Sequence, residues 1–186
     1  AALKACFHTV EPRKMEAVWI VSLNAADVAL GIGSLIGIDR ATAYTAGLLH
    51  TVGMLVMTAA MPDAMRALDG LSHPMAPARP ALEKERFGYC YAQAGAVLLR
   101  HWGLPLRFIE AVEHQFAPLE NDHHEVLAAV INLAGWRARG EFCGLNEADM
   151  ATSYPDEVGL ILELDTDMML AGLPGRHKRT LVSSEG

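Results

Sequence analysis

The sequence predicts an all-α fold, a multi-helix bundle. Apolar residues recur at three- and four-residue steps along most of the chain, which is typical of helices with one buried face. No stretch sustains the alternation of apolar and polar residues that marks a half-buried strand. With 186 residues, 52% of them hydrophobic, the chain is long and apolar enough to bury a core without disulfides.

The first predicted helix is long and begins near Pro12, a residue suited to a first helical turn. Its apolar face extends from Met15 to Ile36, and Gly37 is expected to end it. Asp39 then has the carboxylate needed to cap the next helix.

The stretch between Arg40 and Asp63 contains no charged residue and is about as long as a membrane span, ~20 residues. Threonines, a tyrosine, a histidine and two glycines interrupt it, so a buried central helix, or two helices joined near Gly53, is the preferred interpretation. A short amphipathic helix is expected to follow from Pro62.

In the chain from Asp69 onward, glycine and proline residues mark the ends of the predicted helices. Asp69 to Pro80 is rich in Gly, Ser, Pro and His and is predicted as a loop. The helices expected after it are 81–87, 91–102, one from Pro105 to about Gln115, one from Asn121 or Asp122 to Gly140, and shorter ones at 156–164 and 167–171.

These elements suggest a division of the chain into four parts. Residues 11–140 are expected to form the helical core, and 141–175 a C-terminal helical appendage. Residues 1–10 are expected to be an N-terminal segment; the family resemblance given below implies that it is either the end of a missing preceding helical half or what is left after its loss. Residues 176–186, with their basic and serine-rich composition, are predicted to be a mobile tail.

Charge and cysteine content exclude several functional classes. The formal net charge of -7 argues against broad binding of a nucleic-acid phosphate backbone. Three widely spaced cysteines, without a Cys-x-x-Cys pair, indicate neither a disulfide framework nor a zinc knuckle. No basic leader followed by an apolar run opens the chain, and a reducing cytoplasm is the expected location.

Three phrases of the sequence carry a family resemblance: residues 47–56 (GLLHTVGMLV), 85–95 (ERFGYCYAQAG) and 109–118 (IEAVEHQFAP). Their order and spacing, with Trp102-Gly-Leu-Pro105 before the third, resemble the HDOD family of bacterial signalling domains. That family is related to the HD and HD-GYP phosphohydrolases. The resemblance covers about Trp19 to Arg139 and implies an HD-like helical bundle, often joined to receiver, kinase or cyclic-di-GMP-turnover domains.

The metal-binding relatives hold divalent ions with histidines and aspartates. The resemblance places those ligand positions on Val21, on the pair His50-Thr51, on Tyr91, on the pair His114-Gln115 and near Gly135. Two imidazoles remain and no carboxylate does, whereas a metal centre that splits phosphodiesters needs several converging ligands and an activated water. The resemblance therefore implies a degenerate member with no metal, no cofactor and no catalytic residue. The residues expected to remain as a vestigial pocket are His50, Thr51, Tyr91, His114 and Gln115.

Each histidine of this pocket has an ordinary structural interpretation. His50 is predicted to be a buried histidine with one hydrogen-bond partner, a ligand-binding role being the alternative. Tyr91 is expected to fill the space left by a former ligand, with its hydroxyl bonded to His50 or His114. For His114, which follows Glu113, a helix-terminus or surface role and a pocket role both stay open.

Other candidate groups are expected to be structural. Residues 122–125 (DHHE) resemble a metal motif, but neighbours on a helix point about 100° apart, so a solvated first turn is predicted. Cys90 lacks a recognisable activating partner for a nucleophile. The methionines at 54, 57, 61 and 65 are expected to fill the core rather than to form a docking stripe.

The function expected is that of a non-catalytic regulatory module in bacterial signal transduction, which binds a protein partner or a neighbouring domain. Neither a membrane nor nucleic acid is an expected partner, and a homo-oligomer is left open. A docking surface near Ala1 to His8 is expected because Leu3 and Phe7 would be exposed at the edge of a half-domain.

Two alternatives belong to other classes. The first is a residual metal-dependent phosphohydrolase that uses His50 and His114 with carboxylates from Glu85, Glu113 or Glu110. The second is a nucleotide sensor, whose sign would be an open, polar cavity around His50, Tyr91 and His114.

Overall fold

The structure is a computed structural model that describes residues 11–120, 126–171 and 173. These residues form α-helices and contain no strand, which confirms the predicted all-α class. The helices are α2 (Pro12–Ile36), α3 (Arg40–Leu49), α4 (Val52–Ala60), α5 (Pro62–Asp69), α6 (Arg79–Phe87), α7 (Tyr91–His101), α8 (Leu106–Glu113), α9 (Val126–Phe142), α10 (Glu147–Thr152), α11 (Asp156–Ile161) and α12 (Thr166–Ala171).

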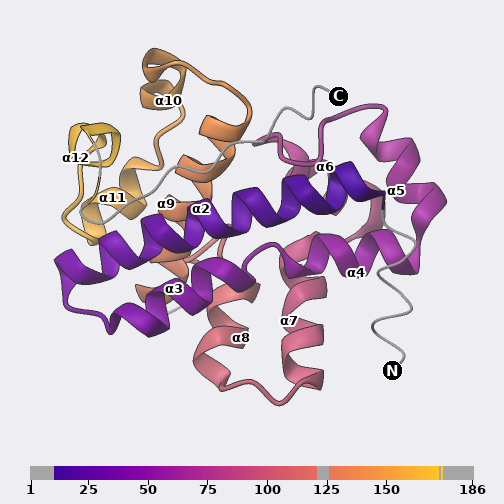
Figure 1. Ribbon diagram of the computed structural model, residues 1–186, viewed down its shortest axis with the longest axis horizontal. Coiled ribbons are helices and arrows are strands. Elements are labelled where there is room, and N and C mark those ends of the chain that lie inside the picture. Colours follow the sequence, from indigo (N-terminus) through magenta and orange to yellow (C-terminus); the bar gives the residue numbers. More distant parts are fainter. Residues whose placement is uncertain (1–10, 121–125, 172, 174–186) are drawn as a thin grey trace, which may run out of the picture.

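Helix α2 is the longest helix and organises the bundle. It runs across most of the width of the molecule, with α3 folded back beneath it (Figure 1). It begins with Pro12 in its first turn and ends at Gly37, whose φ of 78° is left-handed and whose amide donates to the carbonyl of Gly33. Asp39 caps α3 by accepting a hydrogen bond from the amide of Thr42, as expected.

The junction between the two apolar helices after Asp39 lies two to three residues before Gly53, near which the sequence predicts it. Helix α3 ends at Leu49 and α4 begins at Val52, so His50 and Thr51 form the junction rather than Gly53. Gly53 instead lies where α4 crosses α7, because a Cβ there would come within 1.9 Å of the carbonyl oxygen of Tyr91. The close crossing brings the His50–Thr51 junction next to the start of α7.

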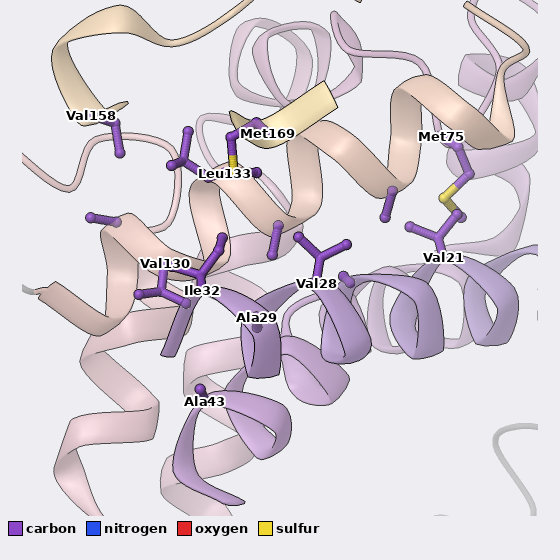
Figure 2. Packing of buried hydrophobic residues seen from close by; sticks show 14 of the residues in the cluster. Val21, Val28, Ala29, Ile32, Ala43, Met75, Val130, Leu133, Val158 and Met169 are labelled. Carbon is purple, nitrogen blue, oxygen red and sulfur yellow. The ribbon is translucent and has the colours of Figure 1, made fainter. Parts of the chain in front are cut away.

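The hydrophobic core lies between α2 and α9. Figure 2 shows Val28 and Ile32 of α2 near Val130 and Leu133 of α9, with Met169 of α12 on the same cluster. Of the methionine stripe, Met54, Met57 and Met65 are fully buried and Met61 packs against the core, which confirms their role as core filler.

Two helical stretches, Pro12–Ile36 and Arg40–Ala60, are long and apolar enough to cross a membrane. The most apolar windows of these stretches are 61% and 56% buried inside the protein, as expected for central helices of a bundle. Three predictions lie outside the described residues: the docking surface at residues 1–8, the turn at 122–125 and the tail at 176–186.

Candidate functional site

His50 is the first member of a buried polar cluster, hereafter the polar centre, formed with Thr51, Tyr91, Gln115 and Arg139. The side chain of His50 is fully buried, and its Nδ1 lies 2.6 Å from the carbonyl oxygen of Gly47. A ring nitrogen facing a carbonyl must carry the hydrogen, so Nε2 is left as a lone-pair nitrogen. Nε2 has no hydrogen-bond partner among the described residues.

Burial also fixes the charge of His50. Loss of solvent, with a smaller contribution from the nearby Arg139 cation, lowers the pKa of His50 from 6.5 to about 3. The imidazole is therefore neutral at physiological pH. Thr51, the other residue of the junction, is also buried, and its hydroxyl hydrogen-bonds the hydroxyl of Ser22 on α2.

Tyr91 occupies the centre as the first residue of α7, and its hydroxyl has a different partner from the one predicted. Nη1 of Arg139 on α9 donates to this hydroxyl over 3.0 Å, whereas the sequence predicted a bond to His50 or His114. The prediction was wrong because His50 turns its protonated nitrogen to Gly47, and a guanidinium fills the remaining space. Burial raises the pKa of Tyr91 to about 12, so its hydroxyl stays neutral.

The guanidinium of Arg139 is enclosed by aromatic and glycine neighbours. It lies 5.2 Å from the centroid of the Phe116 ring, and that ring packs edge-on against Tyr91 at 5.4 Å. A Cβ at Gly135, one helical turn before Arg139, would lie 3.0 Å from Nη1 of Arg139 and 3.4 Å from Nε2 of His50. Glycine at position 135 therefore lets the arginine and the histidine approach the same point of α9.

Gln115 closes the centre from the end of α8. Its Nε2 donates to the carbonyl oxygens of His50 at 3.0 Å and of Val112 at 2.9 Å. Asn132 of α9 in turn donates to the carbonyl of Gln115 at 2.6 Å. His114 is half-buried and is the residue directly after the end of α8.

Of the ligand positions implied by the family resemblance, 50, 91, 115 and 135 lie together, but the side chains at the implied positions do not fit a divalent metal. Val21 and Gly135 provide no donor atom, Thr51 is bonded to Ser22, and the Tyr91 hydroxyl accepts from a cation. No group of three histidine, cysteine, aspartate or glutamate side chains within metal-binding reach occurs in the described part of the chain. A structural or catalytic metal needs about four such ligands or three with a water.

The carboxylates named for a residual hydrolase are engaged or exposed elsewhere. Glu85 is exposed on α6, Glu110 is half-buried on α8, and Glu113 is ion-paired with Arg100 at 3.2 Å. Glu83 is a fully buried carboxylate next to Tyr91; it accepts from the Tyr91 amide at 2.8 Å and from Nε of Arg79 at 2.9 Å. Burial raises the pKa of Glu83, but both of its oxygens are already bonded.

An apolar cavity of about 170 Å³, hereafter the tryptophan groove, lies between α2, the α3–α4 junction and the end of α7. Trp19 and Trp102 line it and are 49% and 43% exposed. Ser22 and Thr51 also line it, so the groove adjoins the polar centre. The remaining lining is aliphatic, from Val18, Leu48, Leu49, Val52 and Leu55.

Comparison with a family model decides the relationship of this chain. The HDOD domain model matches residues 1–118, which contain both the His50–Thr51 junction and Tyr91. The chain belongs to the HDOD family. The predicted resemblance is thereby confirmed, and the match includes the phrases at 47–56, 85–95 and 109–118 that carried it.

Solved structures similar to this chain support the same fold. A protein of Shewanella amazonensis SB2B, provisionally named a phosphohydrolase, is 22% identical, with a TM-score of 0.65 over 82% of this chain and 57% of that one. The MmoQ response regulator of Methylococcus capsulatus str. Bath is 25% identical in one structure, with a TM-score of 0.60 over 83% of this chain and 60% of that one. This HDOD chain therefore spans less than two thirds of the length of these proteins. No curated protein matches it.

The family and the response-regulator neighbour together support a module associated with signalling.

Sequence reasoning missed Arg139, a member of the centre, and Asn132, which donates to the carbonyl of Gln115. Asn132 and Arg139 lie on the same face of α9 as Gly135, three residues before it and four residues after it. The available signal was a pair of polar residues on either side of this glycine.

Proposed function

We propose that this HDOD domain is a non-catalytic regulatory module of bacterial cytoplasmic signalling, which acts by binding a protein partner or an adjacent domain. The observation that carries the proposal is the polar centre itself. Its side chains are buried, and it presents no carboxylate with which to activate water.

Burial supports a role without a substrate in this centre. His50, Tyr91 and Gln115 are each no more than 1% exposed, and Arg139 is 7% exposed. A nucleotide sensor would need an open polar cavity at this place, whereas aromatic and guanidinium groups fill the space between His50, Tyr91 and Phe116. These contacts do not favour either the hydrolase or the nucleotide-sensor alternative.

The tryptophan groove supports a partner-binding role. Half-exposed tryptophans beside an aliphatic cavity are typical of the anchor points of protein interfaces, where aromatic residues contribute most of the binding energy. The groove is continuous with Thr51 and Ser22, so a partner side chain bound in it would contact the α3–α4 junction directly.

A site-specific photo-crosslinker tests this function in the host cell. A photoreactive amino acid replaces Trp102, and the expected result is a discrete adduct with another protein or with an adjoining domain of the same polypeptide. Leu71, which is 72% exposed but does not line the groove, provides the matched control position.

The adduct at position 102 should be lost when Trp19→Ser is added and should be absent at position 71. Equal crosslinking at both positions, or crosslinking that ignores Trp19, would show that the groove is not the binding surface. Metal-dependent hydrolysis of bis(p-nitrophenyl) phosphate that disappears in His50→Ala would instead support the phosphohydrolase.

A further inference from the structure

Arg139 is a buried cation without a carboxylate of its own. Among the residues that the structure describes, no ion pair joins it to an aspartate or glutamate, and its Nε has no hydrogen-bond partner. Burying an unpaired charge is costly, so a buried arginine in this state calls for an explanation. Its neighbours provide one.

The groups around Arg139 stand at three of the ligand positions implied by the family. Its Nη1 donates to the hydroxyl of Tyr91. Nη1 of Arg139 and Nε2 of His50 also both lie close to the position that a Cβ at Gly135 would occupy. Positions 50, 91 and 135 therefore converge on a guanidinium in this chain. The guanidinium also lies over the face of the Phe116 ring, which carries a partial negative charge.

We propose that the Arg139 guanidinium takes the place of the metal ion in the polar centre, so that an internal cation holds this centre together and excludes divalent ions. The neighbouring atoms suit that role. Nε2 of His50 is a buried acceptor with no hydrogen-bond partner among the described residues, and it faces the same point of α9 as Nη1 of Arg139. A fixed positive charge complements this lone pair, and it repels a second cation at short range.

The first test uses the wild-type 186-residue chain, labelled with ¹⁵N, and adds Mn²⁺ as the probe. Paramagnetic broadening should not be centred on the amide signals of His50, Tyr91 and Gly135; Mn²⁺ that binds at surface sites should broaden most strongly the signals nearest to those sites. Saturable broadening centred on these three signals would overturn the proposal. This measurement needs no variant and so does not depend on a substitution being tolerated.

The second test restores a carboxylate at the point where arginine and histidine meet. In Gly135→Asp the new carboxylate should pair with Arg139, and Mn²⁺ should leave the melting temperature unchanged. In Gly135→Asp with Arg139→Met the carboxylate and Nε2 of His50 become available together. Saturating Mn²⁺ should then raise the melting temperature by roughly 5 °C, the shift expected when a ligand binds only the folded state.

Arg107 provides a matched control for the loss of an arginine. It is exposed, and its guanidinium lies 5.1 Å from the centroid of the Phe108 ring, so it makes the same kind of contact at the surface. Gly135→Asp with Arg107→Met should show no response to Mn²⁺. An equal response in the two double variants, or no response in either, would show that Arg139 is not what keeps divalent ions out.

Discussion

Two buried polar clusters meet at the first residue of α7, and they balance charge in opposite ways. The backbone amide of Tyr91 belongs to an ion-pair network in which Lys14 and Arg79 face Asp69 and Glu83 at 2.7–2.9 Å. The side chain of Tyr91 belongs to the polar centre, where Arg139 is the cation and the acceptors around it are neutral. Tyr91 thus belongs to both clusters: its amide bonds to a network with two carboxylates, and its hydroxyl bonds to a centre with none.

The difference teaches that this fold accommodates one fully buried carboxylate, Glu83, and one partly buried carboxylate, Asp69, but not at the family's ligand positions. Asp69 and Glu83 tie the end of α5 and the middle of α6 to α2 and α7, so their charges serve the packing of helices. At the ligand positions that the family resemblance implies, the polar centre has an imidazole and no carboxylate. A protein that needed a metal there would be expected to place acids there too.

The largest expected effect is on the charged network. Glu83→Gln leaves the fully buried Arg79 with only Asp69 as an ionic partner and should lower the free energy of unfolding by about 3 kcal/mol. Urea denaturation followed by circular dichroism measures this. Glu85→Gln, on the exposed side of the same helix, should change it by less than about 0.5 kcal/mol; similar losses in both variants would contradict the network's role.

A steric effect of intermediate size is expected in the polar centre. Gly135→Ala places a methyl group 3.0 Å from Nη1 of Arg139 and 3.4 Å from Nε2 of His50, and should cost about 2 kcal/mol. Gly70→Ala is the control, because a Cβ there meets nothing closer than 3.4 Å and its φ of -69° suits alanine. A neutral Gly135→Ala, measured in the same denaturation assay, would mean that arginine and histidine do not converge there.

The pH dependence of stability tests the polar centre, because His50 is buried there in its neutral form. The folded-state pKa of His50, about 3, lies below its ordinary value of 6.5, so the unfolded chain binds the proton more readily. Stability should be full above pH 6.5 and fall as the pH drops toward 3, by up to about 1.4 kcal/mol per pH unit from this group. Denaturation of wild type and His50→Gln between pH 7 and pH 4 measures the difference; identical slopes would exclude a buried neutral His50.

The smallest effect is expected from one hydroxyl. Tyr91→Phe removes the acceptor of the 3.0 Å bond from Arg139 and should cost about 1 kcal/mol. Tyr89→Phe removes only a 3.9 Å contact between an exposed hydroxyl and the sulfur of Met61, and should leave stability unchanged. Thermal unfolding of the two variants side by side would contradict the account if Tyr89→Phe proved the more damaging.

The sequence could predict most of the fold because helix ends carry local signals. Pro12, Gly37 and Asp39 act within their own turns, so their effects can be read without knowing the tertiary structure. The α3–α4 break lies near Gly53, as predicted, but Gly53 itself marks a close helix crossing and not the helix end. The convergence of His50, Tyr91 and Gln115 could be expected only from the family resemblance, since the three residues lie on separate elements.

The sequence alone could not predict that Arg139 belongs to the polar centre. An arginine near the end of an amphipathic helix is usually a surface residue, because lysine and arginine are rarely buried. Its burial depends on the ring of Phe116, the hydroxyl of Tyr91 and the missing side chain at position 135, which only the tertiary structure brings together.

Native mass spectrometry of the purified chain tests the central claim most directly. The chain is expressed in medium supplemented with Fe²⁺, Mn²⁺ and Zn²⁺, and its intact folded mass is compared with that of His50→Ala. A wild-type mass equal to that of the polypeptide alone is predicted. One or two metal ions retained by the wild type and lost in His50→Ala would contradict the account.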